Sequence, residues 1–458
     1  MTRTFDCVVI GAGQAAPYLA VRLAKAGQRT ALVERRRLGG TCVNDGCIPT
    51  KTLVASARAA WVVRQAARWG VEVGGPVRVD MKRVKERKDA IVAESIRNLE
   101  RWLGGTADLT LIRGHARFVD PHAIEVGGER IEAGRFFLNT GARAQIPELQ
   151  GLADVPFLTS TSILELDSAP PHLVVLGGSY VGLEFAQMFH RFGSQVTVLE
   201  RGDRLLGRDD ADVSTEIASI LTDEGLTIHT GAEAVRVARA DGGVAVTVKR
   251  GDREARVAGS HLLIGLGRIP NTGDLGLDRA GVAVDHRGHV VVDDELRTSQ
   301  PHVWALGDCN GRGAFTHTSY NDFEIVAGNL LDGDPRRVTD RIPIYALYID
   351  PPLGRCGMTE AEARTAGHNL LVGKRPMTRV GRARERGETR GFLKIVVDAD
   401  SKQLLGAALL GIEGDEAVHE IVDLMYARQP YTTLQRAVHA HPTVSELLPT
   451  VLGSLRPS

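Results

Sequence analysis

Two stretches of the chain repeat one pattern, and this repeat limits the possible folds more than any other feature. Residues 5–34 read FDCVVIGAGQAAPYLAVRLAKAGQRTALVE, and residues 172–200 read HLVVLGGSYVGLEFAQMFHRFGSQVTVLE. Each has a short apolar run, a glycine turn and a stretch with helical periodicity, followed by a β-branched run that ends in glutamate. This is the order of a strand, a helix and a second, parallel strand. We therefore predict an α/β fold with two copies of one βαβ unit.

The first glycine turn has the residue types that a dinucleotide requires. Gly11 permits the tight turn, Gly13 lets a pyrophosphate approach the backbone, and Ala16 permits close packing of the helix on the strand. The phosphates then meet free N–H groups at the start of the helix. Glu34 ends the next strand, where a carboxylate accepts hydrogen bonds from a ribose. The pattern predicts a dinucleotide site.

The second turn, Gly177-Gly178-Ser179-Tyr180-Val181-Gly182, differs because Ser179 replaces the central glycine. Glu200 ends its second strand, and an acid at this position favours a free 2′-hydroxyl and repels a 2′-phosphate. Arg201 and Arg204 follow closely and partly offset that repulsion. The sequence therefore favours NADH over NADPH as the second nucleotide.

Composition excludes several other classes of protein. The chain has 56 basic and 56 acidic residues, so it lacks the basic surplus of a protein that chiefly binds nucleic acid. The basic run that starts the predicted helix at 80–103 is interpreted as a solvated face. No apolar run is long enough to span a membrane, and the N-terminus leads into a strand without a signal peptide. We expect a cytoplasmic protein that binds neither nucleic acid nor membrane.

Two of the five cysteines lie close together, in GGTCVNDGCIPTK at residues 39–51. A loop that folds back can bring Cys42 and Cys47 together, and Cys47 starts a predicted helix whose N-terminus stabilises a thiolate. Half a zinc site would need a second ligand pair, which the sequence lacks, so no metal site is predicted. In a neutral chain without an export signal, the pair is interpreted as redox-active. The other cysteines are predicted to be structural: Cys7, Cys309 and Cys356.

Together these motifs resemble the FAD-dependent pyridine nucleotide–disulfide oxidoreductases, which include dihydrolipoamide dehydrogenase, glutathione reductase and mercuric reductase. The resemblance covers nearly the whole chain and includes GLGRIPN at 265–271, ALGDCNG at 305–311 and HAHPTVSE at 439–446. It implies two Rossmann-like domains, for FAD and NAD(P), and an α+β C-terminal dimerisation domain. The implied boundaries are 1–147 for the first part of the FAD domain, 148–266 for the NAD(P) domain, 267–335 for the second, central part of the FAD domain and 336–458 for the dimerisation domain.

The resemblance also implies a route for the electrons. Hydride passes from the nicotinamide to the flavin, and the flavin reduces a Cys42–Cys47 disulfide. By position, Cys47 is the thiolate that contacts the flavin, and Cys42 attacks the substrate disulfide. Lys51 lies near the flavin and pairs with Glu184, and Tyr180 gates the nicotinamide pocket. The other cofactor contacts that the resemblance implies are Gly40, Thr41, Lys51, Ala116, Thr140, Gly141, Gly177, Ser179, Val181, Gly182, Glu184, Glu200, Gly267, Gly307, Asp308, Ala314 and Thr316, with Asp308 on the ribityl chain.

His441 is the predicted acid–base residue. Thiol–disulfide exchange needs an acid to protonate the leaving thiolate and a base to regenerate the Cys42 thiolate. Pro442 stiffens the loop, and Glu446 can hold the imidazole in one tautomer. In the family that the chain resembles, such a pair is delivered across a two-fold interface, which implies a homodimer. His439 is interpreted as structural.

Departures from the relatives leave the acceptor open. The tail ELLPTVLGSLRPS lacks the C-terminal cysteine pair of mercuric reductases, and Val21 and Asn329 stand where glutathione reductase has carboxylate-binding arginines. Asp45 is expected to disfavour a nearby thiolate, and Tyr18 is expected to face the approaching substrate. We predict a homodimeric NAD(P)H-dependent flavoprotein that reduces a small-molecule disulfide, with NADH favoured. Dihydrolipoamide dehydrogenase and a mercuric-reductase-like or copper-type metal-ion reductase are the alternatives.

Overall fold

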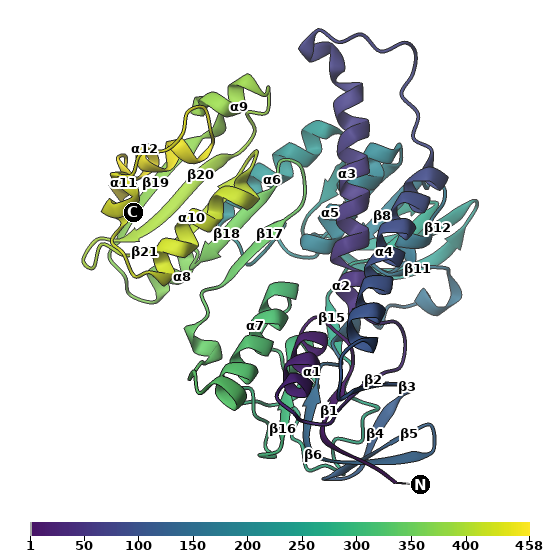
Figure 1. The fold of residues 1–458 in the computed structure, drawn as a ribbon. Helices are drawn as coiled ribbons and strands as arrows, with labels where there is room; N and C mark the ends of the chain where they lie inside the picture. Colours follow the sequence, from purple (N-terminus) through teal and green to yellow (C-terminus); the bar gives the residue numbers. More distant parts are fainter. Residues whose placement is uncertain (1) are drawn as a thin grey trace. The chain divides into compact units, whose positions relative to one another are not determined.

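The computed structural model describes residues 2–458, which form two compact units (Figure 1). The first unit contains residues up to 52 together with 85–145 and 267–341, and the second contains 53–84, 146–266 and 342–458. Two helices, α3 (Cys47–Arg64) and α4 (Met81–Gly104), have residues in both units.

A seven-stranded sheet forms the centre of the first unit, in the order β3-β2-β1-β6-β5-β4 with β16 beside β6. Strands β3, β2, β1, β6 and β16 run parallel, whereas β5 and β4 continue the sheet as antiparallel neighbours. A separate small pair joins β7 to β15. The bounds are β1 Arg3–Ile10, β2 Thr30–Glu34, β3 Leu109–Arg113, β4 Ala116–Asp120, β5 Ala123–Val126, β6 Glu129–Leu138, β7 Ala142–Ala144, β15 Arg268–Pro270 and β16 Val303–Ala305.

Both faces of β1 are covered, which explains its nearly unbroken apolar run CVVI. Cys7 and Val9 pack in the cluster that contains α1 and α7, and Val8 and Ile10 pack in a second cluster on the opposite face. The helical elements of this unit are α1 (Ala16–Lys25), α2 (Gly40–Asn44), η4 (Gly307–Asn310), α7 (Thr316–Ala327), η5 (Gly328–Asp332) and η6 (Val338–Asp340).

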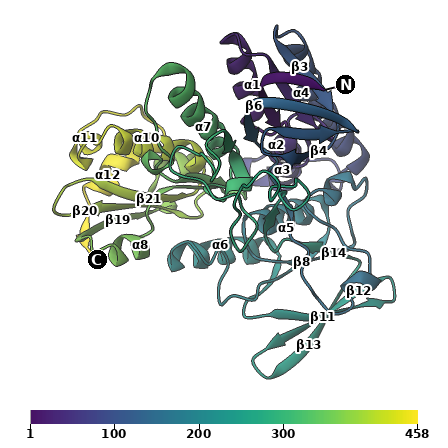
Figure 2. The ribbon, with the colours of Figure 1, turned by 90° about the horizontal axis from the view of Figure 1, so that it is seen from below.

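The second unit contains a four-stranded parallel sheet in the order β10-β9-β8-β14. Its central helix, α5, follows β8 through the second glycine turn, so the repeated pattern forms the predicted strand–helix–strand unit. An antiparallel sheet, β11-β12-β13, extends from this region (Figure 2). The bounds are β8 His172–Leu176, α5 Tyr180–Phe192, β9 Gln195–Leu199, α6 Ala211–Glu224, β10 Thr227–His229, β11 Glu233–Ala240, β12 Gly243–Arg250, β13 Arg253–Gly259 and β14 His261–Ile264, with η1 Ala66–Trp69, η2 Leu152–Asp154 and η3 Ser162–Glu165.

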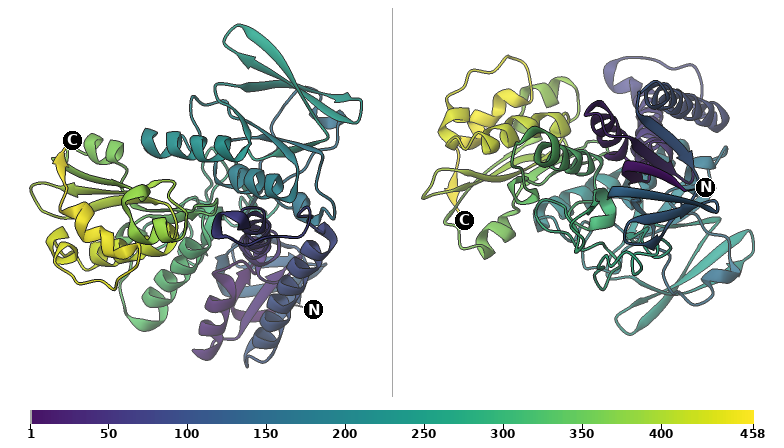
Figure 3. Two further views of the ribbon diagram at one scale, coloured as in Figure 1. Left: turned by 90° about the horizontal axis from the view of Figure 1, so that it is seen from above. Right: turned by 60° about the horizontal axis from the view of Figure 1, so that its bottom comes forward.

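A six-stranded antiparallel sheet, β17-β18-β21-β20-β19-β22, forms the C-terminal part of the second unit. Helices α10 and α12 cover one face of this sheet, where Leu393, Ile395 and Val397 of β20 are buried (Figure 3). Phe392 of β20 belongs instead to the cluster that contains α5 and α6. The bounds are β17 Ile344–Leu347, β18 Leu353–Gly357, α8 Glu360–Thr365, β19 Leu370–Pro376, η7 Met377–Arg379, α9 Gly381–Glu385, β20 Phe392–Asp398, β21 Leu404–Leu410, α10 Gly414–Tyr426, α11 Tyr431–Gln435, η8 Ser445–Leu447, α12 Leu448–Leu452 and β22 Arg456–Pro457.

The predicted fold class is confirmed: two parallel α/β units and an α+β C-terminal part are present. The helix predicted to start at Cys47 is α3, which ends at Arg64 and is followed by a short 3-10 turn, η1. Among residues 2–458, no helix is long and apolar enough to cross a membrane.

Candidate active site

The first turn, between β1 and α1, leaves no room for side chains at its two glycines. A Cβ atom on Gly11, whose φ is +90°, would lie 2.5 Å from the carbonyl oxygen of Asn139. A Cβ on Gly13 would lie 2.6 Å from the amide oxygen of Asn139. That amide oxygen accepts the N–H of Ala16 at 3.2 Å, while the amide nitrogen donates to the carbonyl of Leu306 at 2.8 Å. Asn139 therefore connects the start of α1 to the residue that follows β16.

A cavity opens at this turn and contains much of the predicted FAD site. The buried hydroxyl of Thr140, on its wall, has no hydrogen-bond partner among residues 2–458, and α1 has neither a side-chain cap nor an acid in its first turn. Such a site suits an anionic, hydrogen-bonding ligand, so the residues fit FAD. The predicted contacts that line the cavity are Gly11, Gly13, Glu34, Gly40, Thr41, Ala116, Thr140 and Gly141. Those in the first unit that lie outside its lining are Ala16, Lys51, Gly267, Gly307, Asp308, Ala314 and Thr316.

The carboxylate of Glu34 closes one side of the first turn. One of its oxygens accepts the N–H of Ala12 at 2.8 Å, and the other accepts the N–H of Arg36 at 2.6 Å. The acid predicted to bind a ribose therefore lines the cavity with its two oxygens already oriented by backbone N–H groups.

The thiols of Cys42 and Cys47 interact with each other. Cys42 lies in α2 and is half-buried, and Cys47 is the exposed first residue of α3. Gly46 lets the loop fold back, because a Cβ there would lie 2.9 Å from the carbonyl oxygen of Thr41. The hydrogen bond with Cys47 and then burial raise the pKa of Cys42. The Cys47 sulfur also lies 3.0 Å from the hydroxyl of Thr316, at the start of α7.

Asp45 does not act as the unbalanced acid that the sequence suggested. Its carboxylate lies 2.9 Å from the guanidinium of Arg37 and 3.7 Å from that of Arg36, and its side chain is only 12% exposed. Two cations therefore offset its charge close to the thiol pair. The expectation that Asp45 disfavours a nearby thiolate is wrong for this reason.

The turn before α7 places the partly buried acid Asp308 in the first unit. Gly307, with a φ of +74°, donates its N–H to Asp322 at 2.7 Å, which holds the turn in place. Burial raises the pKa of Asp308, and Arg268, whose Nε lies 3.6 Å from the carboxylate, opposes that change. Gly267 precedes Arg268 with a φ of +114°, and Ala314 is exposed just before α7.

The second turn repeats the geometry of the first. A Cβ on Gly177 would lie 2.5 Å from the carbonyl oxygen of Gly265, and one on Gly182 would lie 2.1 Å from the carbonyl oxygen of Gly177. The two carboxylate oxygens of Glu200 accept the N–H groups of Gly178 and Gly202, both at 2.7 Å. Ser179 makes no cap hydrogen bond to α5, and Val181 is exposed, so the first N–H groups of this helix fit a pyrophosphate.

Tyr180 and Glu184 lie one turn apart on α5, and both are held by hydrogen bonds. The hydroxyl of Tyr180 donates to the carboxylate of Asp209 at 2.9 Å, and burial raises its pKa. The carboxylate of Glu184 is buried and accepts the backbone N–H of Tyr348 at 2.9 Å. Lys51 and Glu184 belong to different units, and their pairing stays a prediction.

His441 and Glu446 form the expected hydrogen-bonded pair. The imidazole Nδ1 lies 2.8 Å from a carboxylate oxygen of Glu446. The side chain of His441 is 77% exposed and that of Glu446 only 16%, so the carboxylate is anchored while the second ring nitrogen faces outward. His439 instead contacts Glu420 at 3.1 Å and is largely buried.

Residues 5–322 match the family described as pyridine nucleotide-disulphide oxidoreductase, and residues 344–452 match its dimerisation domain. The chain belongs to this family. RclA of Escherichia coli strain K12, a probable pyridine nucleotide-disulfide oxidoreductase, is 38% identical over 453 residues, which cover 97% of this chain and 98% of RclA. A mercuric reductase of Streptomyces lividans is 34% identical over 451 residues, covering 97% and 94% of the two chains.

The fold of this oxidoreductase agrees with solved relatives over almost its whole length. The structure described as HOCl-induced flavoprotein disulfide reductase RclA from Escherichia coli has a TM-score of 0.89 and 38% identity, covering 98% of this chain and 99% of that one. A Cu(II) complex of the same reductase matches with a TM-score of 0.89, 37% identity and the same coverage. The protein is therefore a flavoprotein disulfide oxidoreductase that contains FAD and uses NAD(P)H.

Several residues that shape the oxidoreductase site were absent from the sequence prediction. Asn139 follows a buried strand in FFLNTG, and an amide there is the signal that could have identified it. Asp209 and Tyr345 hold Tyr180 and are about 140 positions apart, so no local pattern links them. Tyr18, expected to face the substrate, packs against Trp102, Tyr320 and Phe323, with ring centroids 4.9–5.8 Å apart. The ring thus joins an aromatic cluster beside α1, and its approach to the substrate stays a prediction.

Proposed function

We propose that this oxidoreductase transfers two electrons from NADH to a small-molecule disulfide through the Cys42–Cys47 pair. The observation that carries the proposal is the thiol pair itself: two interacting sulfurs, one half-buried and one at the N-terminus of α3. Bound FAD would supply the two-electron carrier between NADH and the Cys42–Cys47 disulfide. Because the pKa of Cys42 is raised, a proton stays on Cys42 while the helix terminus favours negative charge on Cys47.

The exchange steps balance as follows. The imidazole of His441 takes the proton of Cys42, and the resulting thiolate attacks one sulfur of the substrate, forming a mixed disulfide and breaking the substrate S–S bond. The released thiolate takes a proton from the imidazolium of His441, which Glu446 orients. The thiolate of Cys47 then attacks the Cys42 sulfur, reforms the internal disulfide and releases the second substrate sulfur as a thiolate, which takes a proton from the solvent. The substrate disulfide gains two electrons and two protons in all.

The proposed active unit is a homodimer. His441 is 77% exposed, and Val438, three residues earlier, is 99% exposed, so an apolar side chain and the acid–base residue lie on one outward-facing segment. A large apolar side chain exposed beside a functional residue suits a surface that a partner covers. The match of residues 344–452 to a dimerisation domain supports the same arrangement.

The remaining assignments form part of the same proposal. FAD is held at the first turn with Glu34 on its ribose and Asp308 on its ribityl chain, and NADH is held at the second turn by Glu200. The domain boundaries at 147, 266 and 335 agree with the ranges of the three main sheets, which supports them. We place the enzyme in the cytoplasm, because a cycling thiol pair needs a reducing compartment.

The surroundings of α1 favour an acceptor without carboxylates. Val21 is buried, and the guanidinium of Arg22 lies 2.6 Å from the carboxylate of Asp332. Asn329 uses its amide to bind the backbone of Arg336, donating at 2.8 Å and accepting at 3.2 Å. Neither of the two positions therefore offers a cation to a glutathione carboxylate. We propose a neutral or cationic disulfide as substrate.

Steady-state assays with NADH and two acceptors, 2-hydroxyethyl disulfide and glutathione disulfide, test this function. Wild-type enzyme is expected to prefer the neutral disulfide in kcat/KM. Cys42→Ser is expected to abolish disulfide turnover yet keep the flavin and a long-wavelength absorption band from the Cys47 thiolate. His439→Ala serves as the control for His441→Ala, which should lower disulfide turnover by about 100-fold or more. Full turnover by Cys42→Ser would contradict the proposal.

Reduction of Cu(II) is a second candidate function, because the related RclA has been solved as a Cu(II) complex. Two thiolates are soft ligands that suit copper, and no group of three metal-ligating side chains occurs among residues 2–458 to compete with them. One NADH would reduce two Cu(II) ions to Cu(I) and release one proton. His441→Ala separates the two functions, because copper reduction needs no protonation of a leaving thiolate. Equal loss of both activities would contradict the copper assignment.

A further inference from the structure

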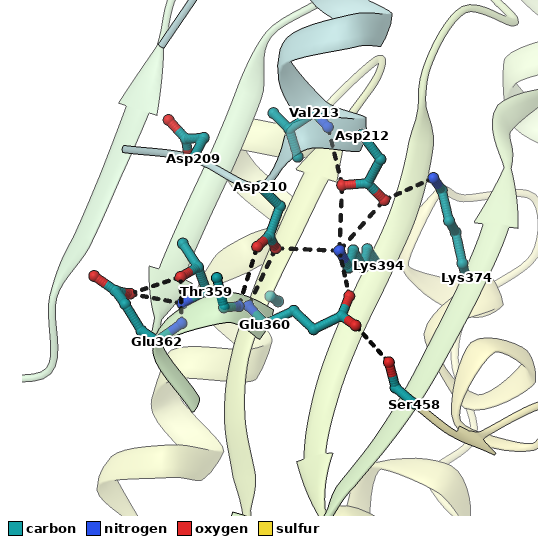
Figure 4. Close-up of polar contacts among 12 residues, drawn as sticks. Asp209, Asp210, Asp212, Val213, Thr359, Glu360, Glu362, Lys374, Lys394 and Ser458 are labelled. Carbon is teal, nitrogen blue, oxygen red and sulfur yellow. Dashed lines mark hydrogen bonds and ion pairs between the residues drawn. The ribbon is translucent and has the colours of Figure 1, made fainter. Parts of the chain in front are cut away.

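An acidic segment, residues 209–212, joins the nucleotide-binding part of the second unit to its C-terminal sheet (Figure 4). Asp210 accepts a hydrogen bond from the ammonium group of Lys394 at 3.1 Å, and Asp212 accepts one from Lys374 at 2.7 Å. Lys394 is only 4% exposed and also lies 3.2 Å from Asp212. A buried cation needs such partners, so the ion pairs fix the acidic segment to β19 and β20.

The first residue of the acidic segment, Asp209, bridges two tyrosines. One carboxylate oxygen accepts the hydroxyl of Tyr180 at 2.9 Å, and the other accepts the hydroxyl of Tyr345 at 3.0 Å. The Nε of Arg355 lies 3.8 Å from the second oxygen, and Tyr345 and Arg355 are cross-strand partners in β17 and β18. Burial raises the pKa of Asp209, while the two hydroxyls and Arg355 favour the carboxylate. We call these four residues the Asp209 cluster.

The Asp209 cluster fixes the side chain of Tyr180 at two points. Its hydroxyl is bound by the carboxylate, and its ring packs edge-on against Tyr345, with centroids 5.3 Å apart and an interplanar angle of 80°. A tyrosine has two main side-chain torsions, so a fixed ring and a fixed hydroxyl define both. Tyr180 is the first residue of α5, directly after the glycine turn. The C-terminal sheet therefore sets the orientation of a side chain at the nucleotide turn.

The next turns of α5 bind the same C-terminal segment. Glu184 accepts the N–H of Tyr348 at 2.9 Å, and the amide oxygen of Gln187 accepts the N–H of Asp350 at 2.7 Å. Positions 180, 184 and 187 lie on one face of the helix, because residues three and four apart are neighbours. Contact between α5 and residues 345–350 thus begins at Tyr180 and continues along the helix.

We infer that Asp209 and Tyr345 are positioning residues for hydride transfer from NADH. The inference rests on the proposed function and on the place at the nicotinamide pocket that the family resemblance implies for Tyr180. With the hydroxyl and ring of Tyr180 held, one wall of that pocket keeps a fixed shape, and the nicotinamide binds in a single orientation. The Asp209 cluster acts only through Tyr180, so it serves the step in which NADH gives up its hydride and not the later thiol exchange.

A double-mutant cycle on the holoenzyme tests this inference. Tyr345→Phe and Tyr180→Phe keep both rings and each remove one hydroxyl from Asp209. Stopped-flow absorbance measures how fast NADH reduces the flavin, and a second mixing experiment measures how fast reduced enzyme consumes disulfide. Tyr431→Phe is the matched control, because the hydroxyl of this partly buried tyrosine makes no hydrogen bond among residues 2–458.

Each single variant is expected to slow reduction by NADH about tenfold, the effect of losing one hydrogen bond to a buried carboxylate. The double variant should be no slower than Tyr180→Phe alone, because both changes act through one hydroxyl. The rate of disulfide consumption in these variants should match that of wild type. The control variant should match wild type in both half-reactions. A normal or faster reduction rate in Tyr345→Phe, or equal slowing of both half-reactions, would overturn the inference. Failure of the proposed function is seen separately, as wild-type enzyme that NADH does not reduce.

Discussion

In both glycine turns a glutamate holds the backbone in the same way, but different residues hold the helix that follows. In both, a glutamate at the end of the second strand accepts two backbone N–H groups: Glu34 in the first turn and Glu200 in the second. Beneath the first turn lies Asn139, whose amide binds α1 and the neighbouring strand end, whereas Gly265 has the same place beneath the second. The start of α5 is held instead by Tyr180 and the Asp209 cluster, from the C-terminal sheet.

This difference shows how a duplicated motif can be supported by different surroundings. The first sheet has an extra strand, β16, beside β6, and the carbonyl of Leu306 that follows it receives the amide of Asn139. The four-stranded sheet of the second unit ends at β14, beside which Leu158 forms a single parallel bridge, and Gly265 has no side-chain amide to bind a neighbouring strand. A helix start that lacks support from its own sheet must be fixed from elsewhere, and residues 345–350 provide that support.

The largest expected effect comes from adding a Cβ atom to the first glycine of each turn. Gly11→Ala puts a Cβ 2.5 Å from the Asn139 carbonyl at a φ of +90°, and Gly177→Ala puts one 2.5 Å from the Gly265 carbonyl at a φ of +108°. Both positions must shift to accommodate the new atom. We expect Gly11→Ala to bind almost no flavin, and Gly177→Ala to keep its flavin but to show almost no reduction by NADH.

Flavin absorbance per protein and NADH stopped-flow rates distinguish the two outcomes. Gly27→Ala is a suitable control, because a Cβ there meets no atom within 4 Å although its φ is also positive, at +78°. Loss of flavin from Gly177→Ala would show that the two turns do not serve separate nucleotides.

Local sequence was sufficient to predict both turns, because the residues that make them are contiguous and each glycine has a steric reason. The same holds for the pair Cys42 and Cys47 and for His441 with Glu446, which lie within a few positions of each other. Each of these patterns lies within a short stretch of sequence, so it can be recognised without knowing any distant contact.

The residues that brace the turns could not be predicted, because their partners are distant in sequence. Lys394 in the strand FLKIVVD signals a buried cation that needs acids, yet nothing in the sequence says that Asp210 and Asp212 supply them. The charge of Asp45 was misjudged for a related reason, since Arg36 and Arg37 lie near in sequence but their direction depends on how the loop folds.

The next largest effect is expected at Asn139, which has no counterpart in the second unit. Asn139→Ala leaves the buried N–H of Ala16 without its partner, and the carbonyl of Leu306 keeps only the weaker thiol donor of Cys309, at 3.3 Å. Each unsatisfied group costs about 1–3 kcal/mol, so the first unit should unfold at clearly lower temperature and bind flavin more weakly. Thermal unfolding followed by flavin fluorescence measures both. Asn329→Ala, at an amide nearer the surface, should shift the transition much less; an equal shift would contradict the role given to Asn139.

A smaller effect is expected when the glutamate of either turn, Glu34 or Glu200, loses its charge. Glu200→Gln keeps an acceptor for the N–H of Gly178 but removes the charge that repels a 2′-phosphate. The ratio of kcat/KM for NADH to that for NADPH should fall about tenfold, corresponding to about 1.4 kcal/mol. Glu34→Gln, the matching change in the first turn, should leave this ratio unchanged. If both variants change it equally, the assignment of the two turns to different nucleotides is wrong.

The smallest difference expected between the units concerns their buried thiols. Burial raises the pKa of Cys309, behind the Asp308 turn, to about 11 and that of Cys356, in β18, to about 12. An unfolded thiol has a pKa of about 8.5, so above that pH unfolding releases a proton that the folded protein keeps. Each thiol therefore lowers the free energy of unfolding by up to about 1.4 kcal/mol per pH unit, until its folded pKa is reached.

Cys309→Ala and Cys356→Ala should each make stability less sensitive to pH between pH 8.5 and 10, by about 1–2 kcal/mol over that range. The measurement is the difference in unfolding free energy between variant and wild type at each pH, which cancels the constant loss of packing. Val418→Ala removes a comparable volume from the cluster that contains Cys356 and should shift stability equally at every pH. Because the folded pKa of Cys356 is higher, its pH-dependent contribution should continue above pH 11, where that of Cys309 has ended. If stability depends on pH in the same way in the two variants up to the highest pH measured, then Cys356 in β18 is no better shielded from solvent than Cys309 in the first unit.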